Sequence, residues 1–433
     1  MKIKHTLCLL ISIFFNTVLF SNNYTAIDSI KSFINQYQYD KAINLIDKEF
    51  VVNSKSSELY YLKGIALRGM YNYNGAVESF TNASKLDSAN NQYVIDLAYA
   101  YKLVPDYQNA SLCFIKALER DPENSLLLME KGNCFFLMEL YVFAINEFMN
   151  IYNSDSTNYN VVKKIAASYA KLNQSEDSAI KYYNKAIVLN PNDVNNIMSI
   201  SNLYILKREY SKGIALTERF ISMDSTSSKV NSMNAYLYLL NKKYSTSVNL
   251  FTKCYQKGDS TKFVFKNLGI GYFKKDIFDS AKIFLEKAYF RDTADVNNLQ
   301  FLGIACSQSV FKKLGITYLE KALFLEKSKL EDYSTITLNL VKACYSWSPC
   351  PCEKRLNIIL AAIQVNPGNA NLIGNAASEY DHCNIDKVKA IEYYTKFLKM
   401  NFPQSYTGEN KRIEDRLVQL KKELKGELLQ SSK

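Results

Sequence analysis

Apolar and small residues recur along this chain with a period of 34 residues, inside segments whose apolar positions have helical spacing. In one copy, Ala110, Phe114 and Ala117 follow an i, i+4, i+7 pattern, which places the three side chains on one helical face. The position of Phe114 is filled in other copies by Phe80, Phe148, Tyr183, Thr217, Phe251, Leu285 and Leu319. The pattern predicts an all-α chain in which each helix buries one stripe.

Small residues occupy two further positions of this period. On the first helix of each copy they are Gly64, Ala98, Gly132, Ala166, Ser201, Ala235, Gly269 and Gly303. On the second helix they are Ala76, Ala110, Ala144, Ala179, Gly213, Ser247, Ala281 and Gly315. We expect small side chains there because the two helices of a hairpin approach closely, and a larger group would overpack the contact by about 1–3 kcal/mol.

This arrangement resembles the tetratricopeptide repeat, a helix-turn-helix module of 34 residues. Residues 91–124 match its pattern through Ala98, Tyr101, Tyr107, Ala110, Phe114, Ala117 and Pro122. The resemblance covers about Ala26 to Pro403 and implies a right-handed α-solenoid of about ten stacked hairpins. Within it we expect a divergent N-terminal repeat or cap over 22–56, eight repeats over 57–329, and two divergent repeats with a cysteine-rich turn over 330–403.

The two ends of the chain do not follow the repeat pattern. Lys2, Lys4 and His5 precede an apolar run from Leu7 to Phe20, which is typical of a signal peptide over 1–21 and too short for a confident membrane span. An uncleaved anchor is the alternative. The segment 404–433 predicts an amphipathic helix that caps the last repeat or binds a partner. We therefore expect an exported bacterial protein, periplasmic or outer-membrane-associated, with no integral span after cleavage.

Charge and histidine content exclude several function classes. The net charge of +11 is spread over 433 residues, and no dense basic patch interleaves with aromatic residues, so we expect no nucleic-acid partner. Outside the signal the chain has one histidine, His382, and it lacks the motifs of zinc hydrolases, serine hydrolases and phosphate-binding loops. We predict no catalytic residues, no cofactor and no enzymatic activity.

The cysteines fall into two groups. Cys113, Cys134, Cys254 and Cys306 lie on repeat helices, where a thiol fills space. In the second group, Cys344 precedes Cys350 and Cys352 in one turn, and Cys383 follows His382 in the next. Because corresponding turns of neighbouring repeats stack, a disulfide from Cys350 or Cys352 to Cys383 is the leading interpretation for an exported protein.

Two other interpretations of this cysteine-rich turn are less favoured. Cys350, Cys352, His382 and Cys383 have the right ligand types for a metal but no recognised spacing, so we expect no metal site. A redox motif normally separates its thiols by two residues, whereas only Pro351 lies between Cys350 and Cys352. Trp347, in the same turn, is either a contact residue or a cap on the hairpin core.

The resemblance also implies a binding surface, because first helices line the concave groove of such repeats. By position in the repeat, the contacts are Tyr61, Ile65, Ile95, Tyr99, Met129, Asn133, Lys163, Ala167, Met198, Asn202, Ser232 and Tyr236. This mixture suits an extended peptide or a helix, although several members could merely pad neighbouring helices. The clamp that some relatives use for C-terminal carboxylates is not expected, because Ala167 stands where an asparagine is needed after Lys163.

Together these features predict a non-enzymatic scaffold or adaptor in the bacterial cell envelope that binds a peptide or protein in its groove. The alternative is a glycan or peptidoglycan recognition module that uses a surface rich in tyrosine and asparagine.

Overall fold

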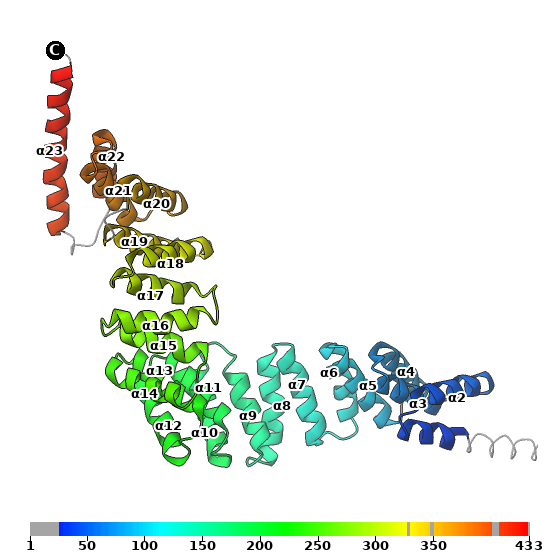
Figure 1. The fold of residues 1–433 in the computed structure, drawn as a ribbon. Helices are drawn as coiled ribbons and strands as arrows, with labels where there is room; N and C mark the ends of the chain where they lie inside the picture. The colour runs from blue at the N-terminus through cyan, green and yellow to red at the C-terminus, as the bar shows by residue number, and fades with distance from the viewer. Residues whose placement is uncertain (1–25, 327–329, 347–349, 401–406, 432–433) are drawn as a thin grey trace, which may run out of the picture. The chain divides into compact units, whose positions relative to one another are not determined.

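A computed structural model describes residues 26–326, 330–346, 350–400 and 407–431 (Figure 1). All regular elements in these ranges are helices, so the prediction of an all-α fold built from helical hairpins is confirmed. The chain divides at Leu203 into two compact units, each of which is a stack of such hairpins. Trp347 and the predicted signal peptide lie outside the described residues.

Unit 1 opens with a helix over residues 26–35. Its further helices are α2 (Tyr39–Val52), α3 (Ser57–Gly69), α4 (Tyr73–Leu86), α5 (Asn91–Leu103), α6 (Tyr107–Leu118), α7 (Ser125–Leu137), α8 (Tyr141–Ser154), α9 (Tyr159–Tyr169) and α10 (Glu176–Leu189), with most of α11 (Val194–Leu206). From α2 to α10 every two successive helices pack on each other. Each hairpin is therefore held mainly by its immediate neighbours.

Unit 2 holds the remaining helices. They are α12 (Tyr210–Met223), α13 (Ser228–Leu240), α14 (Tyr244–Gln256), α15 (Lys262–Phe273), α16 (Phe278–Tyr289), α17 (Val296–Ser307), α18 (Lys312–Leu325), α19 (Leu330–Ser346), α20 (Cys352–Val365), α21 (Ala370–His382), α22 (Lys387–Lys399) and α23 (Thr407–Ser431). Here the first helices α13, α15, α17 and α19 also contact one another in turn. α23 packs on α22 and buries Leu420 completely.

Inside the hairpins, the small residues contact the large side chains that occupy the position of Phe114. A Cβ added at Gly64 would lie 2.6 Å from the ring of Phe80, and one at Gly132 would lie 2.5 Å from the ring of Phe148. Both rings are fully buried. The expectation that larger groups would overpack this contact is confirmed, because an added Cβ would clash with the aromatic ring of the partner helix.

Polar residues begin many of the helices. Asn90, Asn124 and Asn158 precede α5, α7 and α9, and the side chain of each accepts a hydrogen bond from a backbone N–H in the first turn of its helix. These N–H groups have no partner within the helix, so each cap stabilises its helix by about 1 kcal/mol. The asparagines stand 34 residues apart, and the capping chemistry therefore follows the repeat.

The turn inside most of the described hairpins contains a residue with left-handed backbone. Tyr71, Glu139, Lys242 and Asp276 have φ of 61°, 60°, 60° and 58°. Asn or Gly usually marks such a position, because other side chains cost about 1–2 kcal/mol there. Since Tyr, Glu, Lys and Asp fill these four sites, the turn conformation has no plain sequence signal.

Candidate functional site

We define the first-helix face as the outward side of α3, α5, α7, α9 and α11 in unit 1. Of the predicted groove residues it carries Tyr61, Ile65, Ile95, Tyr99, Met129, Asn133, Lys163, Ala167, Met198 and Asn202. All are half-buried except Asn202, which is exposed. Tyr236, on α13 of unit 2, is half-buried against Phe263. The expectation for Ser232 is wrong, because its side chain is buried and hydrogen-bonds the carbonyl of Lys229.

Asp96 joins α3 to α5 at one end of this face. Its carboxylate accepts hydrogen bonds from the Tyr61 hydroxyl and the Arg68 Nη1, both at 2.9 Å, and from the Gln92 Nε2 at 2.8 Å. Burial raises the pKa of Tyr61 well above its usual range, and the negative charge of Asp96 raises it further. The Tyr61 hydroxyl therefore stays protonated and donates to the carboxylate.

Two more ion pairs connect successive first helices. Lys102 on α5 pairs with Glu130 on α7, and Lys163 on α9 lies 2.5 Å from Asp193, just before α11. Burial alone would raise the pKa of Asp193, but hydrogen bonds from Lys163 and Tyr159 outweigh it and lower this pKa to about 2. Arg68, Lys102 and Lys163 are thus each neutralised by a carboxylate of the neighbouring hairpin.

The tyrosines of this face also belong to the core. The ring of Tyr61 stacks on Tyr93, with centroids 4.6 Å apart, and Tyr99 meets Phe114 edge-on at 5.5 Å. Ile95, Tyr99 and Met129 pack against the buried cluster around Phe114. These residues therefore pack against the hairpin core, and only part of each side chain is exposed to solvent.

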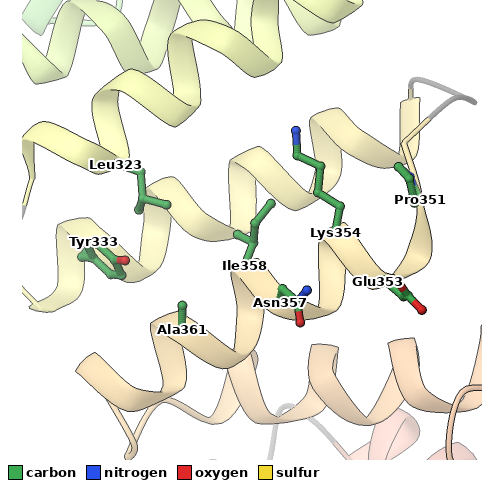
Figure 2. Close-up of a pocket in the computed structure, with 8 residues that line it drawn as sticks. All are labelled: Leu323, Tyr333, Pro351, Glu353, Lys354, Asn357, Ile358 and Ala361. Atoms are coloured by element: carbon green, nitrogen blue, oxygen red, sulfur yellow. The ribbon is translucent and has the colours of Figure 1, made fainter.

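A cleft in unit 2 lies among α18, α19 and α20 (Figure 2). It has a volume of about 550 Å³, and Leu323, Tyr333 and Ile358 supply much of its lining. Lys354, which also lines it, forms an ion pair with Glu320 at 2.7 Å. None of the predicted groove residues reaches this cleft.

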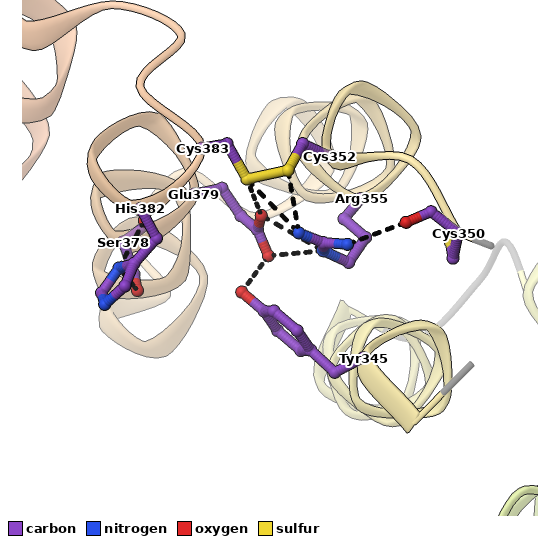
Figure 3. The surroundings of a disulfide bond; sticks show 8 residues. All are labelled: Tyr345, Cys350, Cys352, Arg355, Ser378, Glu379, His382 and Cys383. Carbon is purple, nitrogen blue, oxygen red and sulfur yellow. Dashed lines mark hydrogen bonds and ion pairs between the residues drawn. A yellow bond between two sulfur atoms is a disulfide. The ribbon is translucent and has the colours of Figure 1, made fainter. Parts of the chain in front are cut away.

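The cysteine-rich turn contains one disulfide (Figure 3). It joins Cys352, the first residue of α20, to Cys383, which follows α21, and their Cα atoms are 6.0 Å apart. Of the two partners left open for Cys383, the structure therefore uses Cys352. Cys350 stays a free, buried thiol. The disulfide connects two successive hairpins, α19–α20 and α21–α22.

Arg355 and Glu379 form a buried ion pair beside this disulfide (Figure 3). The Arg355 Nε lies 3.1 and 3.2 Å from the two carboxylate oxygens, while Nη1 donates to the Cys350 carbonyl at 2.9 Å. Nη2 donates to the sulfurs of Cys352 and Cys383 at 3.2 and 3.3 Å. Glu379 is completely buried, so the guanidinium is the cation that makes its charge tolerable.

Tyr345 completes the cluster from α19. Its hydroxyl donates to Glu379, and the guanidinium of Arg355 lies over its ring, 4.4 Å from the centroid. Burial and the adjacent carboxylate raise the pKa of Tyr345 to about 12. Sequence analysis missed Arg355 and Glu379. The available signal was the i, i+4, i+7 series of Leu372, Ala376 and Glu379, which puts a carboxylate on an apolar stripe.

His382 stands apart from these residues. It is exposed, and its Nδ1 interacts with Ser378 one turn back on the same helix. Cys352, Glu379 and Cys383 lie close enough to hold a metal ion, but the two sulfurs are bonded to each other and the Arg355 cation is already in contact with all three. This arrangement binds a cation poorly. Among the described helices, none is long and apolar enough to cross a membrane.

Comparison with known proteins places the chain among repeat proteins. No protein-family model matches it. A TPR repeat-containing protein of Methanocaldococcus jannaschii is 28% identical over 176 residues, which cover 38% of this chain and 30% of that protein, so the match spans less than a third of the relative.

Two solved structures are similar to the chain over more than half of its length. The C-terminal part of a TPR repeat-containing protein from Cytophaga hutchinsonii has a TM-score of 0.48 at 14% identity, over 56% of this chain and 99% of the other. Naa15/Naa10 bound to HypK-THB has a TM-score of 0.43 at 11% identity, over 92% and 65%. With its 34-residue hairpins and small-to-large packing, the chain has the helical-hairpin solenoid fold of tetratricopeptide-repeat proteins, and part of it is similar to a relative of that family.

Proposed function

We propose that this protein is a non-enzymatic scaffold or adaptor that binds another protein through the first-helix face of unit 1. The fold is typical of protein–protein interaction scaffolds, whose stacked hairpins expose long rows of side chains. One observation carries the proposal. From α2 to α10 every two successive helices pack on each other, and the outward residues of the first helices remain half-buried or exposed.

The charges of this face favour an uncharged partner segment. Arg68, Lys102 and Lys163 are already paired with carboxylates of neighbouring hairpins, so an acidic ligand would have to displace an internal partner. Met129 and Met198 offer apolar surface, and exposed Asn202 can hydrogen-bond a peptide backbone. A helix or extended segment with apolar anchors and few charges matches this combination.

The place of action that we propose is the bacterial cell envelope, reached by export and with residues 1–21 removed. The Cys352–Cys383 disulfide supports this, because such bonds persist in oxidising compartments and are rare in reducing ones. Fractionation of cells with N-terminal sequencing of the mature chain tests the proposal. We expect the protein in envelope or periplasmic fractions with a new N-terminus near Ser21, and an intact N-terminus in the cytosol would contradict it.

Site-specific photo-crosslinking in cells tests the binding face. A photoreactive amino acid replaces Met129, Met198 or Asn202 on the first helices, and matched controls replace Leu112 on α6 and Val188 on α10, which are exposed on second helices. We expect all three first-helix positions to capture the same protein and neither control position to capture it. Capture from the second helices alone would place the interface elsewhere.

The salt dependence of binding separates this proposal from an electrostatic one. With the captured partner in hand, its affinity should change less than about threefold between 50 and 500 mM salt, because screening has little effect on an interface without free charges. A fall of about tenfold or more would show that acidic groups of the partner bind the lysines and arginines directly.

The glycan-binding alternative lacks a supporting observation on this face. Sugar recognition needs aromatic rings with an open flat side, but Tyr61 is stacked on Tyr93 and Tyr99 is packed against Phe114. We therefore propose protein binding alone.

A further inference from the structure

Cys344 and Cys350 form a pair of buried thiols in the α19–α20 hairpin. Cys344 lies near the end of α19 and Cys350 lies just before α20, and their side chains are 1% and 4% exposed. Both belong to one apolar cluster with Leu319 and Leu340. The two buried thiols are therefore neighbours, and burial first and the thiol of Cys350 second raise the pKa of Cys344 to about 12. No outside thiol can reach either sulfur in the folded protein.

The other free cysteines have a different setting. Cys113, Cys134, Cys254 and Cys306 lie on four separate helices of the repeat. After burial, charged side chains such as Lys116 near Cys113 and Lys102 near Cys134 have the largest influence on their pKa values, whereas for Cys344 it is the thiol of Cys350. Two thiols in one buried cluster are thus a particular feature of the cysteine-rich turn.

The neighbouring disulfide shows that this turn is compatible with oxidation. Cys352 is two residues from Cys350, and its bond to Cys383 requires that the chain has met an oxidant of thiols. Figure 3 shows Cys350 apart from that bond, with its carbonyl directed at Arg355. Cys350 is therefore held near Cys344 and is not needed by Cys383.

We propose that Cys344 and Cys350 form a second disulfide, which closes the α19–α20 hairpin and leaves all four cysteines of this region oxidised. In the reaction each thiol loses one proton and one electron. The thiolate of one cysteine attacks an oxidised disulfide of a small-molecule or protein oxidant, and the other thiolate then displaces the mixed disulfide. The two electrons leave with the oxidant as its dithiol. Because both sulfurs are buried, this exchange precedes the packing of α19 against α20.

Peptide mapping without reduction tests this proposal. The full chain is reduced and denatured, refolded in a buffer of reduced and oxidised glutathione, denatured again with iodoacetamide and digested with trypsin. Cleavage gives peptides 343–354, with Cys344, Cys350 and Cys352, and 356–387, with Cys383. We expect the two peptides as one linked species without any alkyl group, and fragmentation that places one bond between Cys344 and Cys350. The glutathione oxidant makes this result independent of the proposed export.

Two variants give the matched controls. Cys344→Ala should add one alkyl group to the linked species, on Cys350, whereas Cys306→Ala should leave the species unchanged. Alkylation takes place in the denatured chain, so a variant that folds poorly still gives a readable count. A linked species with two alkyl groups would overturn the proposal, and so would fragmentation that pairs Cys344 with Cys352 or Cys383.

Discussion

Two neighbouring parts of unit 2 are held together by different interactions. In the α17–α18 hairpin, Gly303 and Gly315 let the helices approach until a Cβ at Gly315 would lie 2.6 Å from the Gly303 carbonyl. Between the α19–α20 and α21–α22 hairpins, a disulfide and the buried Arg355–Glu379 pair make the connection. The regular hairpin therefore depends on close apolar fit, and the C-terminal pair of hairpins depends on polar and covalent links.

The difference matters for how each part fails. An apolar contact weakens in proportion to the surface lost, so a small change costs a few kcal/mol at most. A buried polar cluster fails as a unit, because removal of one member leaves the others unpaired in a medium of low dielectric constant. We therefore expect the C-terminal hairpins to respond more sharply to single substitutions than the glycine-packed hairpin does.

The largest effect is expected for Glu379→Ala. The substitution leaves the Arg355 guanidinium buried without its carboxylate, which should destabilise these hairpins by about 3–5 kcal/mol. Hydrogen exchange of α20 and α21 measures the change locally, which is preferable in a chain of two units.

A double substitution is the control for that experiment. Arg355→Met with Glu379→Leu replaces the ion pair by apolar groups of similar size and should recover most of the lost protection. If the double variant exchanges as fast as Glu379→Ala, desolvation of an unpaired charge is not the cause.

The second effect is that of the disulfide. It joins residues 31 apart in the sequence, and Cys352→Ser with Cys383→Ser should lower the stability of the α19–α22 region by about 3–4 kcal/mol through the entropy of the unfolded chain. Urea unfolding monitored by hydrogen exchange of α20 and α22 gives the value. A reductant should destabilise the wild-type chain more than the variant, which retains only the proposed Cys344–Cys350 bond, and an equal response of both would show that the Cys352–Cys383 bond contributes nothing.

A third effect tests the apolar part of the comparison. Gly303→Ala places a Cβ 2.6 Å from the Cγ of Leu319 and 3.0 Å from the Gly315 carbonyl, so it should cost about 1–3 kcal/mol. Gly368→Ala is the matched control, because a Cβ there meets nothing within 4 Å. Thermal unfolding should separate the two variants by several degrees. Equal melting curves would mean that the hairpin relaxes without cost.

The fourth effect concerns the polar links of unit 1, which are more exposed than those of the C-terminal hairpins. The pKa of Asp193 is about 2 when folded and about 3.9 in an unfolded chain, so its contribution is present above pH 4 and is lost as the pH falls toward 2. Because Lys163 is partly exposed, screening reduces this contribution to about 1 kcal/mol.

Asp193→Asn should therefore lower stability at pH 7 and leave it nearly unchanged at pH 2. Urea unfolding of both chains at the two pH values measures the difference. A loss of the same size at pH 2 would assign it to the lost hydrogen-bond geometry and not to the charge.

The glycine-packed hairpins could be predicted from sequence because their cause is periodic. Gly64, Gly132 and Gly303 occupy one position of the repeat, and each contacts a large side chain at a second fixed position of the repeat. The Arg355–Glu379 pair does not repeat, and charged residues are common on helices, so only its burial in three dimensions distinguishes it. The partial exposure of residues such as Tyr61 and Ile95 follows from their position in the repeat, and their role in binding stays a prediction. The pairing of Arg68, Lys102 and Lys163 depends on side-chain reach between hairpins.

The smallest effect concerns the turn conformation, which no residue type marks in the sequence. Lys242 has φ of 60°, and Gly adopts this backbone without the side-chain penalty, so Lys242→Gly should remove about 1–2 kcal/mol of strain. The added freedom of Gly in the unfolded chain offsets about half of this, leaving a net gain of about 0.5–1 kcal/mol. Lys242→Val should lose stability instead, because a β-branched side chain resists positive φ most strongly. Thermal unfolding of the three chains should give the order Gly, Lys, Val, and a Gly variant less stable than the wild type would show that the turn carries no strain.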